Sequence, residues 1–142
     1  MKNKFRSSCL IASTLDVIGD KWSLLIIRDM FLEKTTFKEF SNTPEKIAPG
    51  ILSSRLKLLE SLELITKRKL PNNKKENIYL LTEKGIDLAP LLTEIALWSD
   101  RNIRTLNPEM VSIESVGFTD EKSKITKATQ MRYRAFVQKT IS

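Results

Sequence analysis

The side chains that could do chemistry in this sequence are one cysteine and a cluster of lysines and arginines. The 142 residues contain no histidine, which excludes His-based catalytic triads, imidazole proton shuttles and zinc catalytic sites. Cys9 is the only cysteine, so neither an intrachain disulfide nor a cysteine-ligated metal site can form. The four glycines lie far apart and cannot build a phosphate-binding loop. We therefore expect a protein that is not an enzyme and that holds no cofactor or metal.

One short segment is rich in basic residues. Five of them, and no acidic residue, lie between Thr66 and Lys75. The whole chain has 24 basic against 17 acidic residues, a net charge of +7. A surface of this sign suits a polyanion, and lysines can neutralise the phosphates of double-stranded DNA with release of counterions. An ordinary solvated turn that discourages edge-to-edge strand pairing is the alternative interpretation.

A second candidate surface follows Pro49, which suits the first position of a helix. Four leucines share one face of this segment: Leu52, Leu56, Leu59 and Leu62. The opposite face offers the Ser53 and Ser54 hydroxyls to phosphates or base edges, and Lys57 to a phosphate or a guanine edge. Arg55 is either a DNA ligand or an intramolecular partner of Glu39 or Glu60. The residues predicted to contact DNA are Thr36, Pro49, Gly50, Ser53, Ser54, Arg55, Lys57, Lys67, Lys69, Lys74 and Lys75.

Apolar periodicity predicts the elements that hold these two surfaces. Helical spacing runs through residues 10–18, and a buried helix follows over residues 22–32 with Asp20 as its cap. Thr36 and Glu39 fit a capping box at the start of a short helix that Pro44 ends. The other predicted elements are the helix after Pro49, strands over 65–70 and 78–81 joined by a turn over 71–77, a long helix capped by Thr82 with an apolar stripe through Trp98, and a last helix over 120–140.

This order of elements is that of a winged helix-turn-helix, a mainly α fold with a small β-hairpin. We predict a winged helix-turn-helix domain over residues 1–101. Residues 102–142 are expected to form a connector, over 101–118, and a C-terminal helical extension. No apolar run approaches the roughly 20 residues of a membrane span, and residues 1–8 lack the apolar core of a signal peptide. The expected location is therefore the cytoplasm, with no membrane partner.

An ordered set of motifs resembles the HxlR-type transcriptional regulators. The matching segments are Cys9, residues 15–22, 25–29, 37–40, 51–60 and 79–85, and Trp98. The resemblance covers about residues 9–101 and implies a homodimeric bacterial winged-helix regulator that binds double-stranded DNA. It also implies that the N-terminal helix and the long helix after the hairpin form the dimer, through Leu10, Leu91, Ile95 and Trp98.

The sequence departs from the family's pattern at several positions. Leu10 replaces the usual proline after the N-terminal cysteine, and Gly50 stands where the family has a basic residue. Glu63 replaces the glycine that normally follows the recognition helix. A left-handed backbone at that position would cost roughly 1 kcal/mol with glutamate. The hairpin has Leu70 and Asn72-Asn73 in place of the family's aromatic residue and prolines.

The resemblance also suggests what the protein senses. Many family members respond to electrophiles or oxidants through the cysteine that Cys9 matches, and a nearby helix start favours its thiolate form. The alternative is a small hydrophobic residue buried in the dimer interface. A small apolar effector beside Trp22 or Trp98 is a second possible input, although both tryptophans are also typical of a plain core.

The predicted mechanism is a dimer that presents two recognition helices to half-sites about 34 Å apart. Effector chemistry at the dimer helices would change that separation and release one half-site. The competing hypothesis is a winged-helix module that binds other proteins and does not read DNA sequence.

Overall fold

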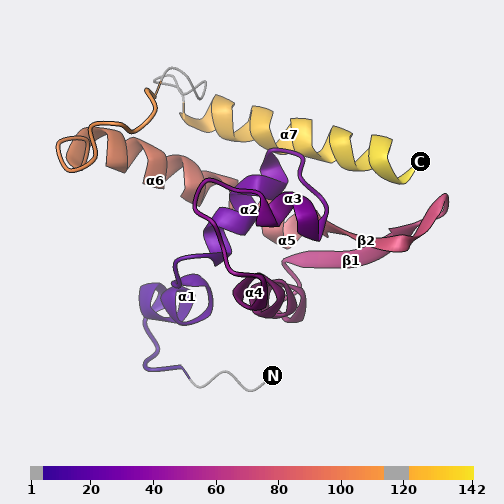
Figure 1. The fold of residues 1–142 in the computed structure, drawn as a ribbon. Helices are drawn as coiled ribbons and strands as arrows, with labels where there is room; N and C mark the ends of the chain where they lie inside the picture. The colour runs from indigo at the N-terminus through magenta and orange to yellow at the C-terminus, as the bar shows by residue number, and fades with distance from the viewer. Residues whose placement is uncertain (1–4, 114–121) are drawn as a thin grey trace. The chain divides into compact units, whose positions relative to one another are not determined.

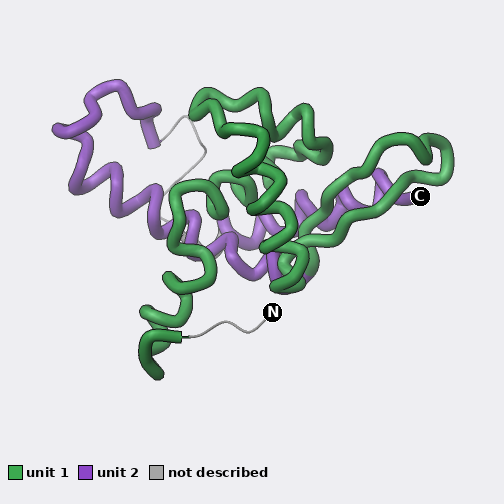
Figure 2. The backbone as a smooth tube through the Cα atoms, turned by 60° about the horizontal axis from the view of Figure 1, so that its bottom comes forward, with its two compact units in different colours: residues 1–82 green, residues 83–142 purple. Residues whose placement is uncertain are grey.

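The computed structural model describes residues 5–113 and 122–142, with side chains from residue 126 onward in the second range. It divides into two compact units, Met1–Thr82 and Glu83–Ser142 (Figure 2). Part of the predicted connector and the predicted start of the last helix at residue 120 lie outside the described residues. The predicted end of the DNA-binding domain at residue 101 stays a prediction.

The described part of the first unit, residues 5–82, contains four helices and a hairpin (Figure 1). In chain order these are α1 (Leu10–Ile18), α2 (Ser23–Phe31), α3 (Phe37–Ser41), α4 (Pro49–Ser61), β1 (Ile65–Leu70) and β2 (Asn73–Leu81). The mainly α class with one small antiparallel hairpin is confirmed.

The core of this unit forms where the apolar helix faces converge. Helix α2 is buried as predicted, and Ile27 and Met30 are fully covered. Phe40 on α3 packs edge-on against Tyr79 on β2, with ring centroids 6.1 Å apart. The Tyr79 amide also donates to the carbonyl of Thr35, at 2.8 Å, just before α3 begins. These contacts tie the hairpin to the helix-turn-helix.

Helices α2 and α4 are both followed by a left-handed residue. After α4 the Glu63 amide donates to the Glu60 carbonyl and the Leu64 amide donates to the Leu59 carbonyl, which is the Schellman pattern. Glu63 has a φ of 60°, and Glu33 after α2 has a φ of 70°. In this conformation a side chain with a Cβ is strained and glycine is not. The left-handed backbone considered for Glu63 is therefore observed.

We expect Glu63→Gly to stabilise the protein by about 1 kcal/mol, because it removes the left-handed strain of a residue with a Cβ. For a chain of this size the gain corresponds to a rise in Tm of about 3 °C, measurable by thermal unfolding at fixed protein concentration. Glu63→Ala is the matched control, since alanine removes the charge but keeps the Cβ. Equal Tm values for the two variants would contradict the explanation.

The hairpin differs from the prediction in its turn. Strand β2 begins at Asn73, so the turn consists of Pro71 and Asn72 and not of residues 71–77. The register passes from the pair Leu70↔Asn73 to the pair Lys69↔Asn77, and residues 74–76 bulge between them. The turn-like composition of residues 71–77 does not reveal this bulge. As a result, Lys74 and Lys75 belong to strand β2 and not to the turn.

The second unit contains α5 (Glu83–Ile86), α6 (Ala89–Asn102) and α7 (Lys122–Ile141). The single long helix predicted after Thr82 is wrong, because it is broken into α5 and α6, with Pro90 at the start of α6. The Thr82 hydroxyl donates to the Glu63 carbonyl at 2.7 Å. Helix α7 packs along α6 of its own chain. Trp98 is 53% exposed, so it is not a core residue of this unit.

Candidate nucleic-acid interface

Helix α4 presents a polar face because its leucines are used for packing. Ala48 is the N-cap with extended backbone, and Pro49 takes the first helical position as predicted. Leu52, Leu56 and Leu59 are buried. On the other side the exposed residues are Pro49, Gly50, Ser54 and Lys57, and Ser53 is half-buried.

The hairpin carries its basic residues outward. Lys67 and Lys69 lie two residues apart on β1, so they share one side of the strand at a spacing of about 6.7 Å. Lys74 and Lys75 lie on β2 in the bulged segment near the turn. All four side chains are exposed, and the hairpin projects away from the helices of its unit (Figures 1 and 2).

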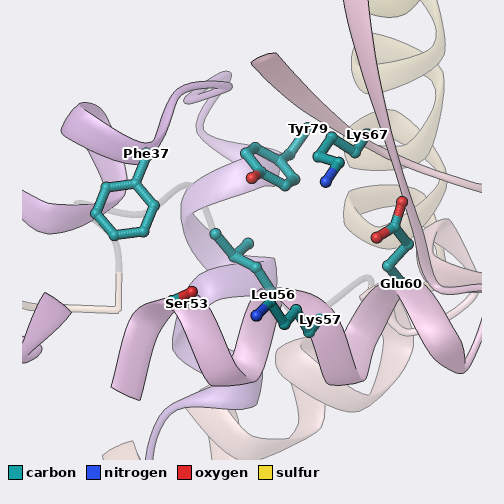
Figure 3. Close-up of a pocket in the computed structure, with 7 residues that line it drawn as sticks. All are labelled: Phe37, Ser53, Leu56, Lys57, Glu60, Lys67 and Tyr79. Carbon is teal, nitrogen blue, oxygen red and sulfur yellow. The ribbon is translucent and has the colours of Figure 1, made fainter. Parts of the chain in front are cut away.

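A small pocket joins the polar face of α4 to the base of the hairpin. It has a volume of about 60 Å³, enough for a few water molecules or one small chemical group. Figure 3 shows its lining residues, which come from α3, α4 and both strands: Phe37, Ser53, Leu56, Lys57, Glu60, Lys67 and Tyr79. The structure thus brings Ser53 and Lys57 of α4 together with Lys67 of the hairpin on one surface of the first unit.

Two groups that line the pocket, the Tyr79 phenol and the Glu60 carboxylate, affect how a polyanion can approach it. Burial raises the pKa of the Tyr79 phenol, and the nearby negative charge of Glu60 raises it further. The phenol is therefore a neutral hydrogen-bond donor at neutral pH. Glu60 places one negative charge beside Lys57 and Lys67, which restricts how closely phosphates approach the inner end of this surface.

Arg55 binds within the protein, and its partner is neither Glu39 nor Glu60. Its Nε donates to Oδ2 of Asp20 at 2.8 Å, and its Nη1 reaches the Ser54 hydroxyl at 3.3 Å. Asp20 also accepts from the backbone amides of Trp22 and Ser23 and from the Ser23 hydroxyl. The sequence pattern predicts only a capping role for Asp20, and nothing in it signals a partner 35 positions away.

The same carboxylate closes the start of α2, although not as the N-cap residue. Trp22 holds the N-cap position. Asp20 lies two residues before it and accepts a hydrogen bond from the Trp22 amide. Burial alone would raise the pKa of Asp20, but the hydrogen bonds from Ser23, Trp22 and Arg55 outweigh it and leave the pKa lowered. One charged group therefore links the α1–α2 junction to the middle of α4.

Thr36 acts as the N-cap of α3. Its hydroxyl oxygen accepts from the Glu39 amide at 3.1 Å, and Glu39 reaches back to the Thr36 amide at 3.2 Å, so the predicted capping box is confirmed. Burial raises the pKa of Glu39, but the amides of Thr35 and Thr36 lower it more strongly. The half-buried Thr36 has a local structural role, and its contact with DNA stays a prediction.

Gly50 leaves room for a side chain at the front of α4. A Cβ built at this position meets no atom within 4 Å. Gly50→Lys would restore the basic residue typical of the family, and we expect about tenfold tighter DNA binding with a salt dependence steeper by about 0.9 per added phosphate contact. Fluorescence anisotropy over a salt series measures both quantities.

The control for this change is Gly50→Ala, which stabilises the helix by up to about 1 kcal/mol without adding charge. Equal DNA affinity of the lysine and alanine variants would show that the front of α4 does not face a phosphate.

The described residues also bear on metal binding and on membrane insertion. Within them, no group of three or more acidic or cysteine side chains is arranged to hold a metal ion. No helix in the described part of the chain is long and apolar enough to cross a membrane.

A helix-turn-helix whose second helix is polar outside, followed by a basic hairpin, defines a winged helix-turn-helix DNA-binding protein. The sequence model of the HxlR-like helix-turn-helix family matches residues 17–107, which is more than half of the sequence. The chain therefore belongs to this family. Its members are transcriptional regulators, so the expectation of a regulator that is not an enzyme is confirmed.

Two relatives place the chain more closely. It is 35% identical over 89 residues to the HTH-type transcriptional regulator YodB of Bacillus subtilis, covering 63% of this chain and 80% of YodB. The reduced form of YodB superposes with a TM-score of 0.57 at 31% identity, covering 73% of this chain and 100% of YodB. The oxidised form of the redox regulator HypR gives a TM-score of 0.60 at 30% identity, covering 66% of this chain and 97% of HypR.

YodB is also known in two chemically altered states. Its quinone-bound form has a TM-score of 0.55 to this chain, with 64% of this chain and 96% of YodB covered. Its diamide-treated form has a TM-score of 0.53 to this chain, with 68% of this chain and 97% of YodB covered. Both superpositions are at 32% identity.

Proposed function

We propose that this regulator binds an inverted-repeat DNA operator as a homodimer, with α4 in the major groove and the β1–β2 hairpin on the adjacent backbone. The observation that carries the proposal is the shared surface of Ser53, Lys57 and Lys67. Hydroxyl and ammonium groups on a helix suit base edges and phosphates, whereas lysines on a hairpin suit phosphates alone. The free amides at the start of α4 add a favourable site for an anion.

Two apolar helix faces support the dimer. On α1, Leu10 is 87% exposed, and Ile11 and Leu15 are also open to solvent. On α6, an exposed stripe at helical spacing consists of Leu91, Ile95 and Trp98. Apolar faces of this kind are typical of an interface that a second subunit covers. A two-fold partner would then present two α4 helices to half-sites about 34 Å apart.

Selection of bound sequences from random duplex DNA tests the function. We expect recovery of an inverted repeat with half-sites about 10 base pairs apart, which establishes sequence-specific binding and the dimer together. If no sequence is enriched and the affinity for DNA does not depend on salt concentration, the protein-interaction module would be favoured.

We further propose that Cys9 is the sensor residue. Cys9 is exposed and is the N-cap of α1, so its thiol is open to electrophiles and oxidants in solution. The hydrogen bonds from Arg6 to the Asp16 carboxylate hold the preceding segment against α1. YodB and HypR, which have been solved in different redox or ligand states, support this assignment by similarity.

Modification of Cys9 would act on DNA binding through the dimer helices. A quinone can add to the thiolate, or two Cys9 thiols can form an intermolecular disulfide while diamide accepts their two electrons and two protons. Because the chain has one cysteine, a disulfide requires the partner's Cys9 or a small thiol. Either product alters the region beside Leu10, and a small change in half-site separation is enough to weaken one contact.

The prediction for Cys9 is a decrease in operator affinity after treatment with diamide or a quinone, at least tenfold by gel shift. Cys9→Ser should bind the operator normally and should not respond. An equal response of the two proteins would exclude Cys9 as the sensor, and a small apolar effector would then become the favoured input.

A further inference from the structure

The net charge of the chain resides in its last helix. Residues 122–142 contain six basic side chains and no acidic one, whereas residues 1–121 contain 18 basic and 17 acidic ones. The region that matches the family model ends at residue 107, so this charge lies outside it. The family's DNA-binding region alone does not account for the positive charge of the protein.

The packing of α7 fixes which of its sides is open. On the inner side the Thr126 hydroxyl donates to the Thr93 hydroxyl at 3.3 Å, and the Gln130 amide donates to the Ile86 carbonyl at 3.1 Å. Tyr133, one turn further, is 1% exposed. These contacts lie within the second unit and hold one face of α7 against α5 and α6.

Several basic side chains of α7 are open to solvent and have no acidic partner among the described residues. Lys127, Arg132 and Lys139 are exposed and, within the described part of the chain, make no ion pair. Arg134 differs, because it forms an ion pair with Glu83 at 2.8 Å. Arg132 and Lys139 are two turns apart on one side of the helix, a rise of about 10 Å.

The chemistry of this outer side fits a nucleic-acid backbone better than a membrane surface. A helix that lies on a membrane needs an open apolar face. In α7 the aromatic Tyr133 is turned inward, and Met131 is the only large apolar side chain among the described ones of this helix that is strongly exposed. What remains is a set of three exposed positive charges, which suits phosphates without sequence recognition.

We propose that α7 is an auxiliary DNA-binding element that contacts phosphates of the bound duplex through Lys127, Arg132 and Lys139. The inference rests on the proposed DNA-binding function and adds a contact surface outside the winged helix-turn-helix. Its contribution is independent of base sequence, so it strengthens binding to operator and non-operator DNA alike.

The test uses the full chain and a fluorescein-labelled duplex of mixed sequence, with anisotropy titrations between about 50 and 200 mM NaCl. We expect the triple variant K127Q/R132Q/K139Q to bind the duplex at least tenfold more weakly. Its salt dependence should be shallower by about 0.9 for each phosphate that the variant no longer neutralises. The triple variant K127R/R132K/K139R keeps the charge and should bind like the wild type. Circular dichroism establishes that each variant is folded.

The outcomes separate this inference from the function on which it rests. Unchanged affinity and salt dependence in the glutamine variant, with weaker binding when Lys74 and Lys75 are replaced by glutamine, would overturn the role of α7 and leave the DNA-binding function intact. Absence of binding by the wild-type protein would overturn both. Weaker binding of the glutamine variant to anionic phosphatidylglycerol vesicles alone, with duplex binding unchanged, would assign α7 to a membrane surface and overturn the proposal.

Discussion

Replacing Lys67, Lys69, Lys74 and Lys75 by glutamine should weaken binding to every duplex sequence by roughly a thousandfold at physiological salt. The four side chains are exposed on a hairpin that projects from the first unit, so their charges act on a ligand and not on the protein's own core. In a dimer the change removes both copies of each charge. The expected signature is a large decrease in the slope of log Kd against log salt concentration, because each phosphate contact contributes about 0.9 to that slope.

The control for the hairpin variant is the same set of positions changed to arginine. Arginine keeps the charge and the length of the side chain, so the arginine variant should retain both the affinity and the salt slope. Thermal unfolding should be unchanged in both variants, since exposed substitutions away from special features alter stability by less than about 0.5 kcal/mol. Wild-type affinity in the glutamine variant would instead support a module that binds proteins through its winged-helix surface.

Sequence specificity should respond differently from overall affinity. Ser53 and Lys57 lie on the polar side of α4, beside the pocket at the base of the hairpin. Contacts from a recognition helix discriminate between bases, whereas hairpin lysines do not. A hairpin variant therefore keeps the operator preference of the wild type while its affinity for all sequences falls.

Features set by local spacing could be predicted from the sequence. The capping box of Thr36 and Glu39 depends on two residues three positions apart, and both hydrogen bonds form. The left-handed conformation of Glu63 was a condition suggested by the glycine that the family has at this position, and the structure shows it. The apolar periodicity of α2 and α4 was enough to predict their buried faces.

Features set by tertiary contacts could not be predicted in the same way. Arg55 had acidic candidates nearby in the sequence, yet packing brings it to Asp20. The hairpin register depends on a two-residue turn at Pro71 and Asn72, and a turn-rich composition does not specify which residues bulge. The break in the helix after Thr82 is a local feature instead, since Pro90 suits a new helix start better than a helix interior, and the continuous apolar stripe through Trp98 concealed this signal.

The second large effect is expected at Asp20. Its carboxylate accepts four hydrogen bonds, from two amides, one hydroxyl and the Arg55 guanidinium, and its side chain is only 24% exposed. Asp20→Ala leaves these donors without their acceptor, and hydrogen bonds to charged groups contribute about 1.5 to 3 kcal/mol each when isolated. Because water replaces part of this stabilisation, we expect a decrease of about 2 to 3 kcal/mol in the free energy of unfolding.

The effect of Asp20→Ala should depend on pH in a defined direction. The folded-state pKa of Asp20 is lowered, so its contribution is present above the pKa of the unfolded chain, about 3.9, and is lost as pH falls through the folded value. Urea unfolding should show a large difference between wild type and variant at neutral pH and a progressively smaller difference as pH falls below about 3.9. A difference that stays constant over this range would show that packing, and not the charged hydrogen bonds, explains the destabilisation.

Arg55→Ala separates the two roles that the sequence left open for Arg55. Asp20 keeps its bonds to Trp22 and Ser23 in this variant, so the expected decrease in stability is about 1 kcal/mol, smaller than for Asp20→Ala. Because Asp20 already neutralises the guanidinium, we expect the salt dependence of DNA binding to stay unchanged. A shallower salt slope in Arg55→Ala would instead show that Arg55 leaves Asp20 for a phosphate when the protein binds DNA, and the α1–α2 junction would then be released at the same time as the recognition helix docks.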